Sequence, residues 1–261
     1  VSQQISSLER HFDTLLIERS KKMFRLTKEG KMLYDHSKEI INTFETLTSR
    51  MQSLQNVVSG NIRVSTIYSI GLHTLPPFLK KFLKKFPTVN VHVEYSYADK
   101  ILEDVLGNVV DLGLLAYPGK DSKLNIIPLM EESLVLICEP GHPLAKRRQI
   151  KLADIAGGNL VGFHIDIPTR RGIDRVLREK KIVVNQVMEF DNIETVKRAV
   201  EIGTGVAIVP EVTIVSEVKL GSLASVKFSD VQLTRPVAVV HKKSKALSPA
   251  LENFLSILTR E

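Results

Sequence analysis

Polar side chains that suit anion binding occur at three points where an apolar, strand-like segment gives way to a helical pattern. Each helix start offers unpaired backbone N–H groups, and these together with the helix dipole favour a negative charge. One start also carries arginine, which can hold a carboxylate or phosphate through two hydrogen bonds. The candidates are Ser65, Thr66, Tyr68 and Ser69, then His164, Thr169 and Arg170, and finally Asn192. The pattern predicts a site for a small anion.

Other interpretations of these residues stay open. Ser65 and Thr66 could be ordinary residues at a strand end, and Arg170 could be a solvent-exposed side chain at a helix start. Asn192 is expected to cap the helix that begins at Ile193, whether or not it also contacts a ligand. Residues 97–99, which follow a further strand, are a weaker candidate of the same kind.

Residue patterns typical of catalysis or metal binding are missing from the sequence. The seven histidines are scattered, and none stands at metal-ligand spacing from other ligating residues. The single cysteine, Cys138, lies in an apolar run and is interpreted as a small buried hydrophobe rather than a reactive thiol. Gly203-Thr204-Gly205 lacks the context of a dinucleotide loop and is interpreted as a helix-to-strand turn. We therefore expect no catalytic residue, no metal and no cofactor.

Alternating strand and helix patterns from about residue 60 onward predict the α/β elements that position the candidate anion site. Strands are expected at 62–67, 89–97, 112–116, 134–138, 160–163, 187–190, 206–209 and 237–240, and helices at 72–86, 101–109, 173–180, 193–202 and 247–258. This order predicts two α/β units, the first of about 60–133 with 242–261 and the second of about 134–241. The arrangement resembles periplasmic binding proteins, so the carboxyl ends of the strands are expected to face one cleft.

The first 31 residues carry a second kind of candidate chemistry, suited to DNA. A short amphipathic helix is expected from Val1, and its polar face holds Ser2, Gln3, Gln4 and Ser6. Glutamine can pair with adenine through two hydrogen bonds, and serine can donate or accept. A small basic hairpin is expected to follow, whose Arg19, Lys21, Lys22 and Arg25 would contact phosphates or enter the minor groove. The alternative is a solvated polar face and a solvated run of charges.

A long helix is expected from about Lys28 to Val58. Its apolar residues recur in steps of three and four, a heptad pattern typical of a two-stranded coiled coil. The seam consists of Leu33, Ile40, Phe44, Leu47, Met51, Leu54 and Val58, with Ser37 in register. The alternative is a helix packed on its own domain.

The bulk composition agrees with an ordinary globular chain of about two domains, since 261 residues are 43% hydrophobic and 25% charged. The formal net charge of +7 permits nucleic-acid binding. A lone cysteine allows no intramolecular disulfide, and no apolar stretch approaches the roughly 20 residues that span a bilayer. We therefore expect a cytoplasmic location and no membrane partner.

Several segments, in order along the chain, resemble landmarks of the bacterial LysR-type transcriptional regulators. They are residues 1–10, 16–20, 25–30, 60–64, 111–114, 140–144 and 203–210. The resemblance implies a partial winged helix-turn-helix DNA-binding domain at 1–27, a dimerisation linker helix at 28–59 and an effector-binding domain at 60–261. It also implies that about two more helices precede Val1 and that the first of the three helix starts holds the effector.

The resemblance further implies a regulator that binds double-stranded DNA as a homodimer or homotetramer, senses a small effector and is not an enzyme. The competing hypothesis is a solute-binding protein or a binding-fold enzyme with no DNA role. That hypothesis accounts for the two α/β units but leaves the basic hairpin and the heptad helix unexplained.

Overall fold

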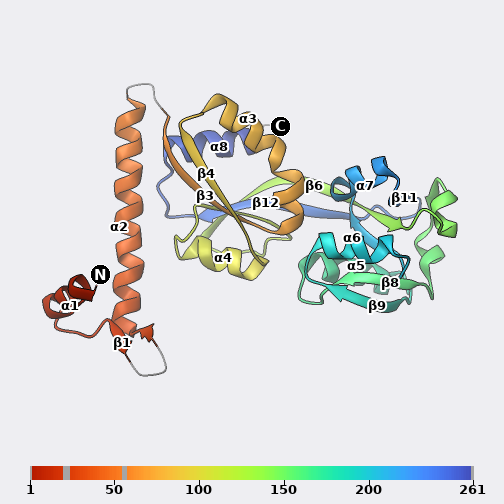
Figure 1. Ribbon diagram of the computed structural model, residues 1–261, viewed down its shortest axis with the longest axis horizontal. Helices are drawn as coiled ribbons and strands as arrows, with labels where there is room; N and C mark the ends of the chain where they lie inside the picture. Colours follow the sequence, from red (N-terminus) through yellow and green to blue (C-terminus); the bar gives the residue numbers. More distant parts are fainter. Residues whose placement is uncertain (1, 20–23, 55–57, 260–261) are drawn as a thin grey trace.

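The computed structural model describes residues 2–19, 24–54 and 58–259, and Figure 1 shows three parts: a small N-terminal part, a long helix, and two α/β units beyond it. Lys21 and Lys22 lie outside the described residues, as do the side chains of Ser2 and Arg19. None of the described helices is both long enough and apolar enough to cross a membrane.

The N-terminal part consists of helix α1 (Ser2–His11) and an antiparallel hairpin of β1 (Ile17–Arg19) and β2 (Phe24–Leu26). The small hairpin predicted from the sequence is thus confirmed. The Glu9 carboxylate joins helix to hairpin, because it accepts hydrogen bonds from the backbone N–H groups of residues 16 and 17 at 3.0 and 3.3 Å. Apolar side chains of α1 and of the turn that follows it remain uncovered within the described residues, since Leu8, Phe12 and Leu15 are exposed.

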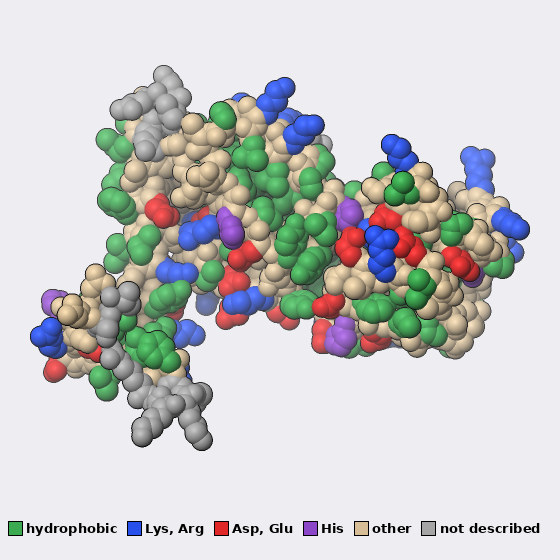
Figure 2. Space-filling model, in the orientation of Figure 1, with side chains coloured by type: hydrophobic (Ala, Val, Ile, Leu, Met, Phe, Trp, Pro, Cys, Tyr) green, Lys and Arg blue, Asp and Glu red, His purple; other side chains and the backbone are tan. Residues whose placement is uncertain are grey.

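Helix α2 (Lys28–Ser53) ends five residues earlier than expected but contains most of the predicted heptad row. Thr27 starts it, since its hydroxyl accepts a hydrogen bond from the N–H of Gly30 at 2.9 Å. Four seam side chains are 56–70% exposed: Ile40, Phe44, Leu47 and Met51. Figure 2 shows hydrophobic side chains along the outer edge of this helix. At these four positions the row is largely exposed, and Phe44 also borders a cavity between α2 and the first unit.

The first α/β unit is built on a sheet in which three parallel strands are followed by antiparallel ones. Its strands are β3 (Gly60–Thr66), β4 (Val89–Tyr95), β5 (Leu112–Ala116), β6 (Leu124–Cys138) and β12 (Thr234–Lys242), in the order β4-β3-β5-β12-β6. Helices α3 (Pro76–Lys85) and α8 (Pro249–Thr259) cover one face and α4 (Ala98–Leu106) covers the other (Figure 1). Strand β5 is buried along its whole length, which is why it appeared in the sequence as a short apolar run.

Strands β6 and β12 join the two units, and both are longer than expected. They pair antiparallel over the whole of β12, from Thr234 opposite Ser133 to Lys242 opposite Leu124. Residues 237–240 of β12 also pair with 113–116 of β5 in the first unit. The long pairing of two strands leaves the units connected by a narrow double-stranded bridge (Figure 1).

The second unit surrounds the far end of β6. Its further strands are β7 (Gln149–Ile150), β8 (Asn159–Phe163), β9 (Asn185–Phe190), β10 (Ala207–Pro210) and β11 (Ala224–Phe228), and its helices are α5 (Pro168–Glu179), α6 (Ile193–Glu201) and α7 (Val215–Leu220). Successive residues of β6 alternate between two cores, with Leu136 in one and Val135 and Ile137 in the other. Burial on both faces explains the unbroken apolar run seen in the sequence.

Candidate functional site

A cavity of about 350 Å³ lies between the two units. Its wall is formed where β3, β4, β8 and β9 end and the next helix begins, as expected for the carboxyl ends of parallel strands. Five of the residues expected at the site line it: Tyr68, Ser69, His164, Thr169 and Asn192. Residues 97–99, the weaker candidate, line it as well.

On the first unit, Ser69 lies directly before a short π-helical turn, Ile70–Thr74, and is 7% exposed. The chain can turn this closely over the strand ends because residue 71 is glycine. A Cβ atom there would lie 2.5 Å from the Thr66 methyl carbon and 2.6 Å from the Tyr95 ring. The neighbouring Tyr68 stacks on Tyr95 with ring centroids 5.1 Å apart. The cleft wall is thus aromatic beside the Ser69 hydroxyl.

Ser65 and Thr66 are not brought to the cleft. Both are completely buried within the described structure, since they belong to the inner strand β3, which has neighbours on both sides. The Thr66 hydroxyl donates to the backbone carbonyl of Ile67 at 3.3 Å. The expectation for these two residues is therefore corrected: they pack under the helix start rather than facing the cavity.

On the second unit, His164 and Thr169 flank the start of α5, and Asn192 starts α6. The Asn192 side-chain oxygen accepts a hydrogen bond from the N–H of Thr195 at 3.1 Å, which confirms the predicted helix cap. The exposed His164 ring lies 3.3 Å from the Asp166 carboxylate. Thr169 is 2% exposed and contributes its hydroxyl from the floor of the cavity.

Arg170 is also not brought to the cleft, although it follows Thr169 directly. Its guanidinium lies in the protein, with Nε 2.8 Å from Asp174 and Nη1 2.8 Å from both Glu189 and the carbonyl oxygen of Phe163. Burial alone would lower the pKa of Arg170, but the hydrogen bonds and charges of the two carboxylates raise it above its ordinary value. The expectation of a ligand-holding arginine here is corrected: this arginine secures α5 to β9.

A different arginine lines the cavity and was not predicted. Arg235 is the second residue of the bridge strand β12, is 2% exposed, and lies opposite Glu132 of β6. The two side chains form an ion pair with Nη2 2.6 Å from Oε2. The sequence gives only a weak indication of this ion pair. Arg235 stands shortly before the expected strand 237–240, and Glu131 and Glu132 stand shortly before the expected strand 134–138. Neither segment was recognised as a strand.

Carboxylates surround the mouth of the cavity. Asp99, Asp166 and Asp191 line it and are exposed. The hydroxyl of Tyr97 donates across the mouth to Asp191 at 3.0 Å, joining the first unit to the second. This hydrogen bond and the Asp191 charge raise the pKa of Tyr97 above its ordinary value. The rim is therefore acidic, whereas the deeper wall carries helix N-termini, hydroxyls and Arg235.

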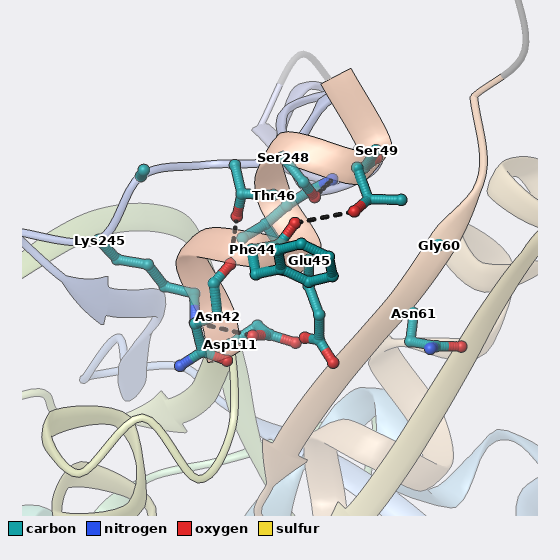
Figure 3. A pocket seen from close by; sticks show the side chains of 13 residues that line it. Asn42, Phe44, Glu45, Thr46, Ser49, Gly60, Asn61, Asp111, Lys245 and Ser248 are labelled. Atoms are coloured by element: carbon teal, nitrogen blue, oxygen red, sulfur yellow. Dashed lines mark hydrogen bonds and ion pairs between the residues drawn. The ribbon is translucent and has the colours of Figure 1, made fainter. Parts of the chain in front are cut away.

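A second cavity of about 260 Å³ lies between α2 and the first unit, and Figure 3 shows its lining. Here Asp111 accepts from Arg63 at 2.7 Å through the backbone N–H and at 3.1 Å through the guanidinium, and it lies 2.8 Å from Lys245. Arg63 also donates to Asn42 of α2 at 2.8 Å. Burial raises the pKa of the Asp111 carboxyl, but Arg63 and Lys245 outweigh it and hold that pKa below its ordinary value. We interpret this polar cluster as the joint that sets the position of α2.

The DNA-contact candidates that the structure describes lie on exposed parts of the N-terminal region. The side chains of Gln3 and Gln4 are exposed on α1, and Ser6 is half-buried. Arg25 is 63% exposed, and its Nε donates to Glu18 across the hairpin at 2.6 Å. Gln3 and Gln4 are thus accessible to a partner, and Arg25 is accessible but already has an acidic neighbour.

Among the described residues, no group of three or more histidine, cysteine or acidic side chains could hold a metal ion. Cys138 is completely buried, and burial raises the pKa of its thiol to about 11, with a further contribution from Glu139. A thiol of that pKa is almost entirely protonated at neutral pH and is a poor nucleophile. The interpretation of Cys138 as a buried hydrophobe is confirmed.

Comparison with known proteins gives one family and many relatives. The family described as "LysR substrate binding domain" matches residues 55–261. The HTH-type transcriptional activator CmpR of Synechocystis is 29% identical over 258 residues, which cover 99% of this chain and 84% of CmpR.

Two solved structures show the same fold. The effector-binding domain of QuiR in complex with shikimate matches with a TM-score of 0.70 at 23% identity, covering 77% of this chain and 96% of that one. Full-length CbnR in complex with its target DNA matches with a TM-score of 0.70 at 19% identity, covering 99% of this chain and 88% of that one. The second match includes the N-terminal part and α2, so the whole arrangement, and not the α/β units alone, has a counterpart.

Proposed function

The chain belongs to the LysR family, whose substrate-binding domain it carries, and from this premise we propose that it is a DNA-binding transcriptional regulator that senses a small anion between its two α/β units. The observation that carries the sensing role is the cavity of about 350 Å³ at four converging helix starts. The backbone N–H groups at helix N-termini favour a negative ligand group before side chains are counted. We propose that the ligand is bound by Tyr68, Ser69, His164, Thr169 and Asn192.

The DNA-binding role is supported by the names of the relatives and by the N-terminal part. CmpR is called a transcriptional activator, and CbnR has been solved with its target DNA. We propose that α1 enters the major groove and that the hairpin contacts phosphates, with α2 holding a homodimer that presents two such helices. The proposed base-contacting residues are Ser2, Gln3, Gln4 and Ser6, and the proposed phosphate-contacting residues are Arg19, Lys21, Lys22 and Arg25.

The proposal includes no catalytic step. Only differential affinity of the ligand for two arrangements of the units can change the state of the regulator, and no bond of the ligand need be broken. We propose no cofactor, and because the target is chromosomal DNA we propose the cytoplasm as the place of action. A solute-binding protein remains the competing hypothesis, but it provides no use for the exposed apolar row of α2.

Ser69→Ala is expected to abolish ligand sensing while DNA binding persists. In a thermal-shift screen of small anions, with shikimate and inorganic phosphate among them, a ligand at 100 times its Kd stabilises by about 2.7 kcal/mol. This corresponds to roughly 5–10 °C for a chain of this size. The variant should lose most of the shift because it loses a buried donor at the cavity floor.

Ser248→Ala is the matched control. Ser248 also lies at a helix start, where its hydroxyl accepts from the N–H of Leu251 at 3.3 Å, but it is remote from the cleft. This variant should keep the full ligand shift. A cationic effector, or an effector that crystallography places outside the cleft, would refute the proposed sensing site.

A further inference from the structure

Arg235 is held rigidly at the junction of the two bridge strands. Its Nε donates to Glu132 at 2.7 Å, and Glu132 in turn accepts from the Thr74 hydroxyl at 2.5 Å. Arginine and glutamate are 2% and 4% exposed, so the pair is shielded from water. Because Glu132 fixes one edge of the planar guanidinium, the remaining N–H groups have a defined direction.

Those remaining N–H groups are aimed at one hydroxyl from each unit. Nη2 donates to Ser69 at 3.0 Å and Nη1 donates to Thr169 at 3.4 Å. A hydroxyl that accepts from a guanidinium must direct its own hydrogen elsewhere. Among the described residues, neither hydroxyl donates to a protein acceptor, and both line the cavity. Their hydrogens are therefore available to a ligand.

We infer that Arg235 is the residue that makes the cleft specific for an oxyanion, by fixing the Ser69 and Thr169 hydroxyls as donors toward one shared ligand group. The inference rests on the proposed sensing function and adds the class of ligand group and the residue that selects it. A carboxylate or phosphate can accept from both hydroxyls at once, whereas an ammonium group has no lone pair and can accept from neither. Arg235 acts through the hydroxyls and is a positioning residue.

The geometry also joins ligand binding to the arrangement of the units. Ser69 belongs to the first unit and Thr169 to the second, while Arg235 and Glu132 belong to the strands between them. An oxyanion that bridges the hydroxyls thus favours the arrangement in which both face Arg235. Because the rim carboxylates are exposed, water and salt screen their repulsion of an anion, whereas the Ser69 and Thr169 hydroxyls are buried.

Selenate is a suitable probe, since selenium can be located in crystals by its anomalous scattering. In the wild-type protein we expect a selenium peak between the Ser69 and Thr169 hydroxyls. The decisive variant is Arg235→Met with Glu132→Gln, which removes both charges together and leaves both hydroxyls in place. If Arg235 directs the hydroxyls, this variant should bind selenate at least roughly tenfold more weakly, as for loss of a hydrogen bond to a charged group.

Two further variants complete the experiment. Arg235→Lys keeps the charge but loses the planar fork, so selenate affinity should also fall about tenfold, and this variant decides the question if the double variant does not fold. Arg198→Met with Glu201→Gln removes an Arg–Glu ion pair from α6, outside the cleft and with its arginine exposed, and should leave selenate affinity unchanged.

Three results would overturn the inference: no selenium peak at the floor at saturating selenate, a peak only elsewhere, or unchanged affinity in the folded Arg235 variants. The proposed function is tested separately by the Ser69→Ala thermal shift with an effector. If the effector shift depends on Ser69 but Arg235 variants bind normally, only the role of Arg235 fails. If selenate binds at the floor but no anion acts as an effector, the sensing function fails and the oxyanion site stands.

Discussion

Phe44→Glu combined with Met51→Glu is expected to convert the protein from a dimer to a monomer at micromolar concentration. The two wild-type side chains are 67% and 59% exposed on α2, and the heptad register places them on one seam. Burying such a side chain contributes about 1.5–3 kcal/mol, and two-fold symmetry doubles the loss. Repulsion between like charges that face each other across the seam destabilises the dimer further, whether the two helices are parallel or antiparallel.

Sedimentation or light scattering over a concentration series measures this effect as a dissociation constant. The control is Lys31→Glu with Asp35→Lys, which exchanges two exposed charges of α2 and should leave the assembly intact. The coiled-coil interpretation is wrong if the seam variant keeps the wild-type dissociation constant.

Arg235→Met alone is expected to lower the free energy of unfolding by about 3–5 kcal/mol, because it leaves the buried Glu132 carboxylate without its counter-charge. Adding Glu132→Gln should recover much of the loss, since a neutral amide needs no counter-charge and can still accept from Thr74. Urea unfolding at neutral pH measures the free energy of unfolding of both variants. If the two substitutions destabilise additively, the buried pair is not coupled and this explanation fails.

The positions of the cleft residues could be predicted where strand and helix patterns were clear. Ser69 and Asn192 each stand between an apolar run and a helical pattern, and such junctions lie at the carboxyl ends of strands. The direction of a side chain could not be predicted in the same way. Arg170 and Thr169 are neighbours in the first turn of α5, yet only Thr169 faces the cavity, because successive helical residues point about 100° apart.

Arg235 could not be predicted because its place depends on pairing across the whole chain. It lies opposite Glu132, 103 positions away, on strands whose lengths were underestimated. The segment 124–133 contains Pro128 and the polar pair Glu131-Glu132, and it was not recognised as a strand. Its strand structure arises from pairing with β12, which is a tertiary effect.

For helix α2, in contrast, the periodicity of the sequence alone was sufficient to predict which side chains form the apolar row. Steps of three and four fix which residues share a stripe on a helix, so the exposed row at Ile40, Phe44, Leu47 and Met51 follows from spacing. The end of the helix was less predictable, because the pattern continued to Val58 while the helix ends at Ser53. Helix ends depend on local caps, which the heptad pattern does not encode.

The central claim, a regulator that recognises DNA sequence, is tested most directly by measuring the affinity of the full-length protein for a selected operator and its point variants by fluorescence anisotropy at several salt concentrations. The account predicts a two-fold symmetric site, affinity that falls steeply with salt, a flatter ranking of operator variants for Gln4→Ala, and uniformly weaker binding for Arg25→Ala. Equal affinity for all sequences, or an operator ranking that Gln4→Ala leaves intact, would contradict it.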